Sequence, residues 1–323
     1  IARQSMVRET EVLLVDDCST DNPAGFVSLA ASYGDKGLTI RLLRLEQRHY
    51  TKNARLAGIE ASQGAVVGFA DADDLLLGTD ALERHARLLL EEKADVVHFR
   101  TALLNADGEF LRENIWTAPF ARSLEGNAVF ARLVNSTGHR STLWSKLFAG
   151  ELARSIVPAA RTSGVRRYRE DVLLTTYLLF HAGRYRASDL LGYGQHRVDK
   201  DREKAGGRAC SSYYMLQQLV PYLKEQGCPP DVLSLYTRKL RRFMQKSLRQ
   251  FLEQLYAEQH PCISDTALER LREHGDDASI LNMLESALTE PPSKGLSRLH
   301  YCLKKISGAL GVPPIRQGLF RVG

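Results

Sequence analysis

An apolar run that ends abruptly in acidic residues constrains this chain more than any other feature. Residues 66–70 read Val-Val-Gly-Phe-Ala, and Asp71, Asp73 and Asp74 follow directly. A short apolar run of this kind suits a strand buried on both faces of a parallel sheet. Such sheets bind ligands at the carboxyl ends of their strands, where an Asp-x-Asp pair suits a hard divalent cation beside phosphate oxygens. A turn with solvated aspartates is the alternative.

The composition is that of an ordinary globular protein. The 323 residues are 44% hydrophobic and 25% charged, and this length predicts two structural units. The formal net charge of +6 allows an anionic ligand or a membrane surface and requires neither. The five cysteines lack CxxC spacing, which indicates reduced thiols rather than a disulfide framework or a zinc site. No apolar stretch reaches the roughly 20 residues of a spanning helix, and no signal-peptide pattern is visible.

Strands and helices alternate along the first hundred residues. Strands are expected over residues 11–15, 38–45, 65–70 and 95–104. Helices are expected from Asp21 to Pro23 onward, and over residues 51–61 and 82–90. This alternation predicts βαβ units and a largely parallel sheet, and residues 105–108, Asn-Ala-Asp-Gly, predict a hairpin turn.

A second strand of this region also ends in paired aspartates. Asp16 and Asp17 follow the apolar run of residues 12–15. In a parallel sheet the carboxyl ends of both strands lie on one edge, so the two acidic ends begin to define a pocket. Helix capping is the alternative for Asp16 and Asp17.

Three motifs together resemble the family 2 glycosyltransferases of GT-A fold. Residues 15–21, Val-Asp-Asp-Cys-Ser-Thr-Asp, resemble the family's VDDGSTD segment, and residues 71–74 resemble its DxD motif. Residues 51–58 resemble its A-R-N-x-G helix, with Leu56 where the family has Asn. The resemblance implies an α/β fold: a three-layer α/β/α sandwich over residues 1–207, followed by a helical carboxy-terminal domain over residues 208–323.

The resemblance also implies a nucleotide-sugar donor at this edge of the sheet. By the family pattern Asp17 would contact the nucleobase, Arg55 the nucleotide, and Asp71 the ribose or the metal shell. Asp73 would bind Mg²⁺ or Mn²⁺ bridging the diphosphate, and the cation would neutralise the leaving group. Asp74 ranks below Asp73, as a residue behind the metal ligands or as a helix N-cap. A surface salt bridge is the alternative for Arg55.

Family members normally begin with a strand that completes the nucleobase pocket. This sequence starts at Ile1, and residues 1–6 would match the helix that follows that strand. We therefore expect the first strand of the fold to be missing from the sequence as given.

An acidic pair, Glu170 and Asp171, directly precedes an apolar helix that begins at Val172. The dipole at a helix N-terminus favours anions and is expected to lower the pKa of both carboxyls. Capping is the alternative for an isolated pair. The pair resembles the family's catalytic-base motif, which implies that Asp171 deprotonates the acceptor hydroxyl and that Glu170 shapes the site. Attack opposite the leaving diphosphate would invert the anomeric centre.

Two other segments resemble family features more loosely. Trp144 opens the sequence Trp-Ser-Lys-Leu-Phe and would be either the floor of the sugar site or a core aromatic. His196 and Arg197 end a segment in which His196 would bind the metal and Arg197 the diphosphate, with surface decoration as the alternative. Residues 198–208 are expected to form a mobile loop that closes over the donor.

From Ser211 onward the sequence predicts helices. Apolar residues recur at helical spacing over residues 236–255 and again over residues 296–310, with lysines and arginines on the remaining surface. Basic amphipathic helices can lie on anionic membranes, and a helical bundle with solvated basic faces is the alternative.

These observations predict a metal-dependent, inverting glycosyltransferase that builds a bacterial surface polysaccharide or glycoconjugate. The favoured donor is a UDP-sugar, and the acceptor is a saccharide or a lipid-linked molecule. The alternatives are a nucleotidyltransferase or phosphohydrolase with the same metal site, and a non-catalytic scaffold of the same fold. No nucleic-acid-binding signature accompanies the pI of about 9.0. The expected localisation is cytoplasmic, at the inner face of the membrane if the acceptor is lipid-linked.

Overall fold

The chain divides into two compact units. The first consists of Ile1–Arg166 and Glu170–Asp199, and the second consists of Arg167–Arg169 and Lys200–Gly323. The computed structural model describes residues 1–20, 25, 28, 32–33, 37–136, 140–165, 168–196, 205–257 and 269–288. Four sequence-based expectations fall on positions outside this set: the start of the helix at Asp21, Arg197, the segment 198–204 and the amphipathic stretch 296–310.

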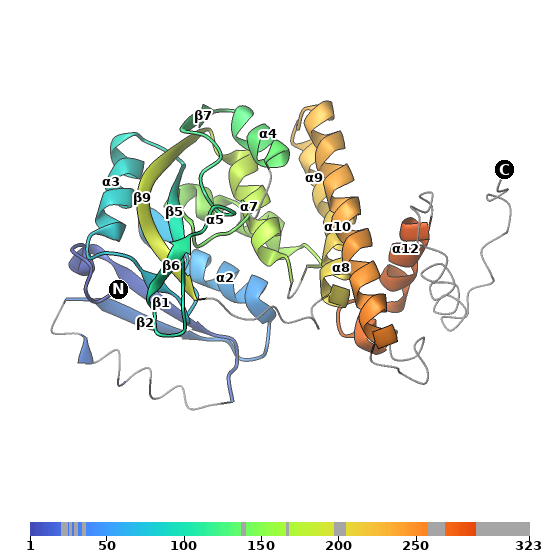
Figure 1. Cartoon of the computed structure of the whole chain (residues 1–323), viewed down its shortest axis with the longest axis horizontal. Coiled ribbons are helices and arrows are strands. Elements are labelled where there is room, and N and C mark those ends of the chain that lie inside the picture. Colours follow the sequence, from blue (N-terminus) through green and yellow to red (C-terminus); the bar gives the residue numbers. More distant parts are fainter. Residues whose placement is uncertain are drawn as a thin grey trace, which may run out of the picture. The chain divides into compact units, whose positions relative to one another are not determined.

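The first unit is an α/β sandwich (Figure 1). Its strands are β1 (Glu11–Asp16), β2 (Thr39–Arg44), β3 (Val66–Gly68), β4 (Leu75–Leu76), β5 (Val96–Leu104), β6 (Phe110–Glu113), β7 (Ser123–Glu125), β8 (Lys146–Ala149) and β9 (Arg184–His196). Its helices are α2 (Tyr50–Ala61), α3 (Ala81–Glu91), α4 (Ala128–Asn135), α5 (Gly150–Ser155), α6 (Val157–Arg161) and α7 (Glu170–His181), with a 3-10 turn, η1 (Val7–Glu9), before β1. The four strands and the two later helices expected from the first hundred residues are confirmed.

The strands form two sheets rather than one largely parallel sheet. β1 and β2 pair in parallel, with Glu11 opposite Thr39 and Asp16 opposite Arg44. The seven remaining strands form a mixed sheet in the order β3-β8-β5-β9-β4, with β6 beside β5 and β7 beside β9. Among the described residues of this second sheet, β5 and β9 are the only parallel pair, and the other pairs are antiparallel. The expectation of a largely parallel sheet is therefore wrong. The confirmed hairpin turn at Gly108 (φ +83°) returns β6 antiparallel to β5, and β8 enters antiparallel between β3 and β5 from later in the chain.

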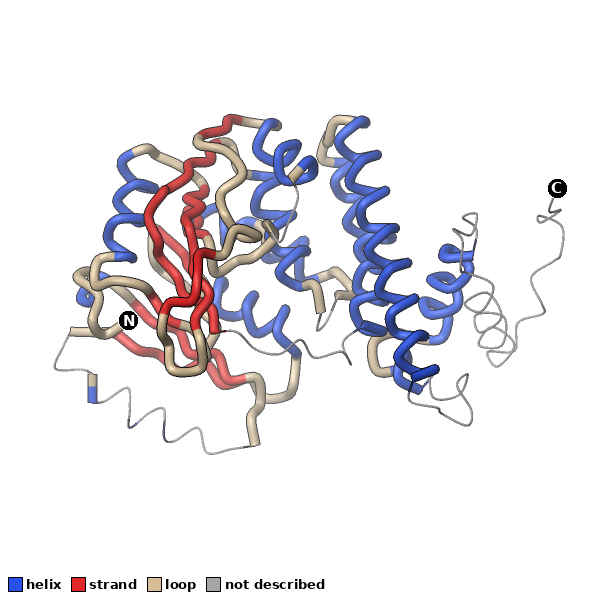
Figure 2. Tube along the Cα trace, viewed as in Figure 1, coloured by secondary structure: helices blue, strands red, loops and turns tan. Residues whose placement is uncertain are grey.

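Helices cover both faces of β5 and β9 (Figures 1 and 2). α3 lies on one face, where Leu89 packs with Phe99, Trp144 and Tyr193 in a buried cluster. α4, α5 and α7 lie on the other side. α2 lies close to β1: a Cβ atom added at Gly58 of α2 would be only 3.3 Å from Val15 Cγ2 of β1. The packing of these layers holds α2, which carries Arg55, and α7, which carries Glu170 and Asp171.

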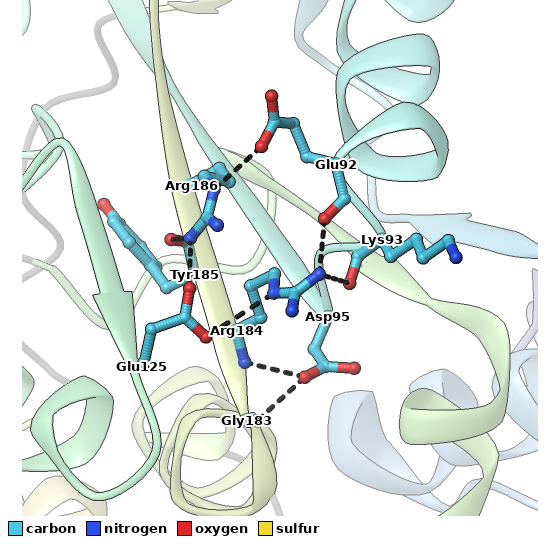
Figure 3. A network of polar contacts seen from close by, with 8 residues as sticks. All are labelled: Glu92, Lys93, Asp95, Glu125, Gly183, Arg184, Tyr185 and Arg186. Atoms are coloured by element: carbon cyan, nitrogen blue, oxygen red, sulfur yellow. Dashed lines mark hydrogen bonds and ion pairs between the residues drawn. The ribbon is translucent and has the colours of Figure 1, made fainter.

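Charged residues at the amino ends of β5 and β9 form a closed network (Figure 3). Asp95 Oδ2 accepts the backbone amides of residues 183 and 184, both at 2.8 Å. Arg186 pairs with Glu125 at 2.9 Å and with Glu92 at 3.3 Å. Because β5 and β9 are parallel, this network lies at the opposite strand ends from Leu104 and His196, and its paired charges indicate a structural role.

The second unit is helical, as predicted from Ser211 onward. Its elements are α8 (Ala205–Tyr214), a π-helical segment η4 (Met215–Leu219), α9 (Val220–Glu225), α10 (Pro230–Ala257) and α12 (Asp277–Leu288). Met244 and Leu248 of α10 pack with Cys210 of α8 and Ile280 of α12 in one buried cluster. The boundary expected between residues 207 and 208 falls inside α8, and the contacts change units between residues 199 and 200.

Among the described residues, no helix combines the length and the apolar character needed to cross a membrane.

Candidate active site

The acidic turn that follows β3 is fastened to the end of β9. Leu75 and Leu76 of β4 pair with Gly194 and Tyr193, so the preceding residues 71–74 lie beside the carboxyl end of β9. The turn is closed by a backbone hydrogen bond of 3.2 Å from the Asp74 amide to the Asp71 carbonyl. The acidic motif thus stands at a carboxyl strand edge, where the sequence placed it.

Asp74 and Tyr193 hold this turn in place. The Tyr193 hydroxyl accepts a hydrogen bond of 2.9 Å from the Asp71 amide and donates one of 2.9 Å to Asp74 Oδ2. Asp74 Oδ1 also accepts the His196 amide at 2.9 Å. Burial raises the pKa of Asp74, and these two hydrogen bonds act in the opposite direction. Asp74 is therefore committed to protein contacts and is not an N-cap, since α3 begins only at Ala81.

Tyr193 was missed as a site residue in the sequence. It lies in the segment 191–197 but carries no motif of its own, and its position depends on long-range pairing of β9 with β4. Its ring stacks on Trp144, with ring centroids 5.0 Å apart. Trp144 is 7% exposed and is a core aromatic under Tyr193, which is the second of the two roles considered for it.

Arg55 joins the acidic turn to the first turn of α7. Its Nη2 lies 3.0 Å from Asp71 Oδ1, and its Nη1 lies 3.1 Å from Glu170 Oε1. The side chains of Arg55 and Glu170 are 17% and 14% exposed, so water screens this pair only weakly. One guanidinium therefore connects three segments that are far apart in the sequence. The alternative of a surface salt bridge does not describe this residue.

Glu170 and Asp171 form the first turn of α7. Asp171 Oδ1 accepts the Val172 amide at 2.7 Å, so the pair does cap the helix in part. Burial and the neighbouring Asp171 carboxylate raise the pKa of Glu170 to about 7, against the effect of Arg55. For Glu170 the expectation of a lowered pKa is wrong, because the loss of water around the carboxyl outweighs the helix dipole.

The acidic end of β1 is tied to the start of α2. Asp17 Oδ1 accepts the His49 amide at 2.6 Å, directly before the helix that carries Arg55. Asp16 Oδ1 accepts the Ser19 amide at 2.9 Å, and hydrogen bonds from Ser19 lower the pKa of Asp16. Asp16 is thus held in a local turn, whereas Asp17 lies at the base of the Arg55 helix.

The two residues expected to bind a cation differ in their surroundings. Asp73 is exposed, and His196 carries a buried Nδ1 with no hydrogen-bond partner in the described part of the chain. No three His, Cys, Asp or Glu side chains among the described residues are grouped so as to hold an ion. Mg²⁺ commonly takes only one or two protein carboxylates and completes its shell with phosphate oxygens and water. The exposed Asp73 carboxylate fits such a site, and the unpartnered His196 nitrogen is a second candidate ligand.

Lys146, at the start of β8, is buried and holds the loop that precedes this strand. Lys146 Nζ donates to the carbonyl oxygens of Arg140 and Thr142 at 2.9 and 2.6 Å and to Ser145 Oγ at 3.0 Å. Burial lowers its pKa to about 7. The Trp-Ser-Lys-Leu-Phe segment therefore packs and braces the loop before β8, and it presents no group to solvent.

Known proteins of one family share this architecture. Residues 1–149 match the model of glycosyl transferase family 2. This part of the chain, somewhat less than half of its length, is thus similar to family 2 glycosyltransferase domains. The two strand-end acidic motifs and the α2 helix all lie within the matched residues, whereas Glu170, Asp171 and His196 lie beyond them.

One relative and one solved structure each match most of the chain. A protein of Escherichia coli strain K12, described as the uncharacterized glycosyltransferase YibD, is 25% identical over 272 residues, which cover 82% of this chain and 72% of that protein. The crystal structure of S. aureus TarS 1–349 covers 96% of this chain and 82% of its own, with a TM-score of 0.54 and 18% identity. The same protein in complex with UDP gives the same values. This likeness concerns the fold, which is of the GT-A type, and together the matches class the chain as a glycosyltransferase.

Proposed function

We propose that this chain is a metal-dependent, inverting glycosyltransferase that moves a sugar from a nucleotide-sugar to an acceptor hydroxyl. The observation that carries the proposal is the Arg55 bridge. It joins Asp71, on the side expected to bind the donor, to Glu170, beside the expected base, at 3.0 and 3.1 Å. Donor-side and acceptor-side groups thus belong to one site within the first unit.

The donor side would be built from three segments. Asp17 would contact the nucleobase, Arg55 the nucleotide, and Asp71 the ribose. A UDP-sugar is the favoured donor, and TarS, which shares the fold, has been crystallised with UDP. Asp73, with His196, would hold Mg²⁺ or Mn²⁺, which when bound supplies positive charge to the departing diphosphate.

Asp171 would act as the general base, because its carboxylate stands next to the Glu170–Arg55 pair at the start of α7. It takes the proton of the acceptor hydroxyl as the acceptor oxygen bonds to the anomeric carbon. The bond from that carbon to the diphosphate oxygen breaks at the same time, and the electron pair leaves with the nucleoside diphosphate. Attack from the opposite face inverts the anomeric centre, so no covalent enzyme intermediate is needed.

The acceptor would be a saccharide or a lipid-linked precursor of a bacterial surface polysaccharide or glycoconjugate. We place the chemistry in residues 1–207 and assign a supporting role to residues 208–323. On this proposal the enzyme acts in the cytoplasm, and at the inner face of the membrane with peripheral contact by the helical unit if the acceptor is lipid-linked.

A panel of nucleotide-sugars tests this proposal. Thermal unfolding of the full chain is followed with each donor, with and without Mn²⁺, and the products of the stabilising donor are then analysed. We expect stabilisation that depends on Mn²⁺, followed by release of nucleoside diphosphate together with a new glycosidic bond. Release of pyrophosphate or inorganic phosphate would identify a nucleotidyltransferase or phosphohydrolase instead. Binding without any hydrolysis or transfer would identify a scaffold.

A further inference from the structure

The longest helix of the second unit presents a basic face without acidic residues. Between Val232 and Leu252 the sequence of α10 contains no Asp or Glu. It contains six basic residues: Arg238, Lys239, Arg241, Arg242, Lys246 and Arg249. A helix with six positive charges and no compensating acid over this length is a strongly charged surface element rather than a mixed solvated face.

The basic residues lie opposite the buried side of the helix. Tyr236, Leu240, Met244 and Leu248 recur every four residues and are at most 5% exposed. Arg238, Arg242 and Arg249 are exposed and fall on the other side at helical spacing. From residue 238 to residue 249 this side extends for roughly 16 Å at 1.5 Å per residue.

Among the described residues, four of these six basic side chains have no acidic partner. In the part of the chain that the structure describes, Arg241, Arg242 and Lys246 form no ion pair, and the Nη1 of Arg238 contacts the uncharged Ser234 Oγ at 3.3 Å. By contrast, described arginines of the first unit such as Arg161 and Arg186 are matched by glutamates. The charges of Arg238, Arg241, Arg242 and Lys246 are therefore available to an anionic partner.

The form of this face indicates which anionic partner fits. Its charges lie along one straight helix, as a flat charged surface such as a bilayer requires. One aromatic, Phe243, lies beside these basic residues and is 40% exposed, but the guanidinium of Arg169 covers one face of its ring at 4.8 Å from the ring centroid, which leaves less of it for base stacking. The apolar side of α10 is committed to the core of the unit, so among the side chains described for this helix Phe243 is exposed but no continuous apolar face is left to insert.

We propose that the basic face of α10 docks this protein on anionic phospholipid by charge attraction alone, without insertion. This inference deepens the proposed function, because it names the surface by which an enzyme acting on membrane-bound acceptors would reach them. It rests on the proposed function only for that purpose, since docking needs neither donor nor acceptor.

Vesicle co-sedimentation of the full chain tests the docking directly. The vesicles contain phosphatidylcholine alone, or phosphatidylcholine with about one third phosphatidylglycerol. We expect binding only to the anionic vesicles at about 0.1 M salt, and release at about 0.5 M, where the Debye length is less than half as long. Binding to neutral vesicles, or binding that persists in high salt, would overturn an electrostatic mode.

A pair of charge-matched variants locates the surface. R241E/R242E/K246E replaces three positive charges of α10 by negative ones, and K93E/R112E/R122E does the same at exposed positions of the first unit. Both bring the formal net charge of +6 to zero. We expect the α10 variant to bind about tenfold more weakly or worse, with an unchanged melting temperature, and the control variant to bind within about twofold of the parent chain.

The variants also separate this inference from its competitors. Equal loss in both would show that net charge, and not α10, governs binding. Tight binding of a fluorescent DNA duplex with no binding to anionic vesicles would assign the face to nucleic acid and overturn the proposal. Donor turnover by the α10 variant in free solution stays normal on this account, so a failure of docking and a failure of the proposed enzymatic function are read from different measurements.

Discussion

The Arg55 guanidinium forms ion pairs with two carboxylates, Asp71 and Glu170, which belong to other segments of the chain. The sequence predicted a role for this arginine beside a nucleotide, and it gave no sign that Glu170 would share it. The two residues are separated by 115 positions, and only the packing of α2 against α7 brings them together. Tyr193 was missed for the same reason. Motifs reveal residues that carry chemistry, but not the partners that orient them.

The Arg55–Glu170 contact predicts a measurable coupling in stability. At about pH 8, above the Glu170 pKa of about 7, R55M should lower the free energy of unfolding by about 1–3 kcal/mol, because a shielded carboxylate loses its partner. R55M/E170Q should lose less than the sum of the two single variants, by about 1 kcal/mol. Denaturant titration of the four proteins measures this difference.

Arg161 of α6 offers the matched control, because its partner lies on the helix that carries Arg55. It contacts Glu60 of α2 at 2.7 Å, but both side chains are about half exposed or more. R161M should therefore change the free energy of unfolding by less than about 0.5 kcal/mol.

For the Arg55–Glu170 pair, strict additivity of the losses caused by R55M and E170Q would show that this ion pair contributes nothing to stability in solution.

Asp171 carries the prediction for catalysis. D171N keeps the shape of the side chain and its contact with the Val172 amide but removes the basic oxygen. With the donor found in the nucleotide-sugar panel, we expect kcat to fall by roughly 10²–10⁴-fold, while donor affinity stays within twofold. Transfer assays and donor binding by calorimetry give the two values. D189N, at a side chain that is 79% exposed, serves as the control and should leave both unchanged. Near-normal turnover of D171N would remove Asp171 from the role of base.

At the scale of elements, the sequence predicted which strands are present better than it predicted how they pair in the sheets. The strands of residues 11–16, 39–44, 66–68 and 96–104 were each visible as short apolar runs. Their pairing was not, because β8 and β6 enter beside β5 from later in the chain, and neither apolar pattern nor length reveals a strand's neighbours. The pattern of apolar residues also could not predict which polar residues are buried between these strands.

His98 of β5 is such a residue, and it predicts a pH dependence of stability. Its side chain is fully buried, and the Thr117 carbonyl at 2.8 Å accepts from Nε2, so a neutral ring uses Nδ1 to accept from the Tyr185 hydroxyl at 2.9 Å. Burial, and next the charge of Lys146, hold the pKa of His98 well below 6.5. Below pH 6.5 the unfolded chain therefore binds a proton that the folded chain does not, and stability falls with falling pH.

Denaturant titrations of the parent chain and H98Q between about pH 5 and pH 7 should show this loss as the difference between the two proteins, because the raised pKa of Glu170 acts in the opposite direction in both. We expect His98 to contribute up to about 1.4 kcal/mol per pH unit below its unfolded pKa. H98Q should be less stable at neutral pH, because a buried hydrogen bond is altered, yet its stability should depend less steeply on pH. Parallel curves for the parent chain and H98Q would mean that His98 is not the group responsible.

At the scale of the whole molecule, the sequence predicted an α/β unit followed by a helical unit, and the fold has both. Composition supported only the count of units, whereas the joint occurrence of three motifs supported the family. The acidic motif after β3, the Arg55 helix and the acidic pair before α7 come from separate parts of the first unit. Their meeting through Arg55 is a property of the whole fold, which no one segment of sequence contains.

Binding of Mn²⁺ in the presence of UDP, counted by electron paramagnetic resonance of the free ion, tests the central claim most directly. If one carboxylate-rimmed site holds cation and nucleotide together, the parent chain binds Mn²⁺ only when UDP is present, D73A fails to do so, and D171N still does. A D73A variant that binds Mn²⁺ with UDP as tightly as the parent chain would contradict this account.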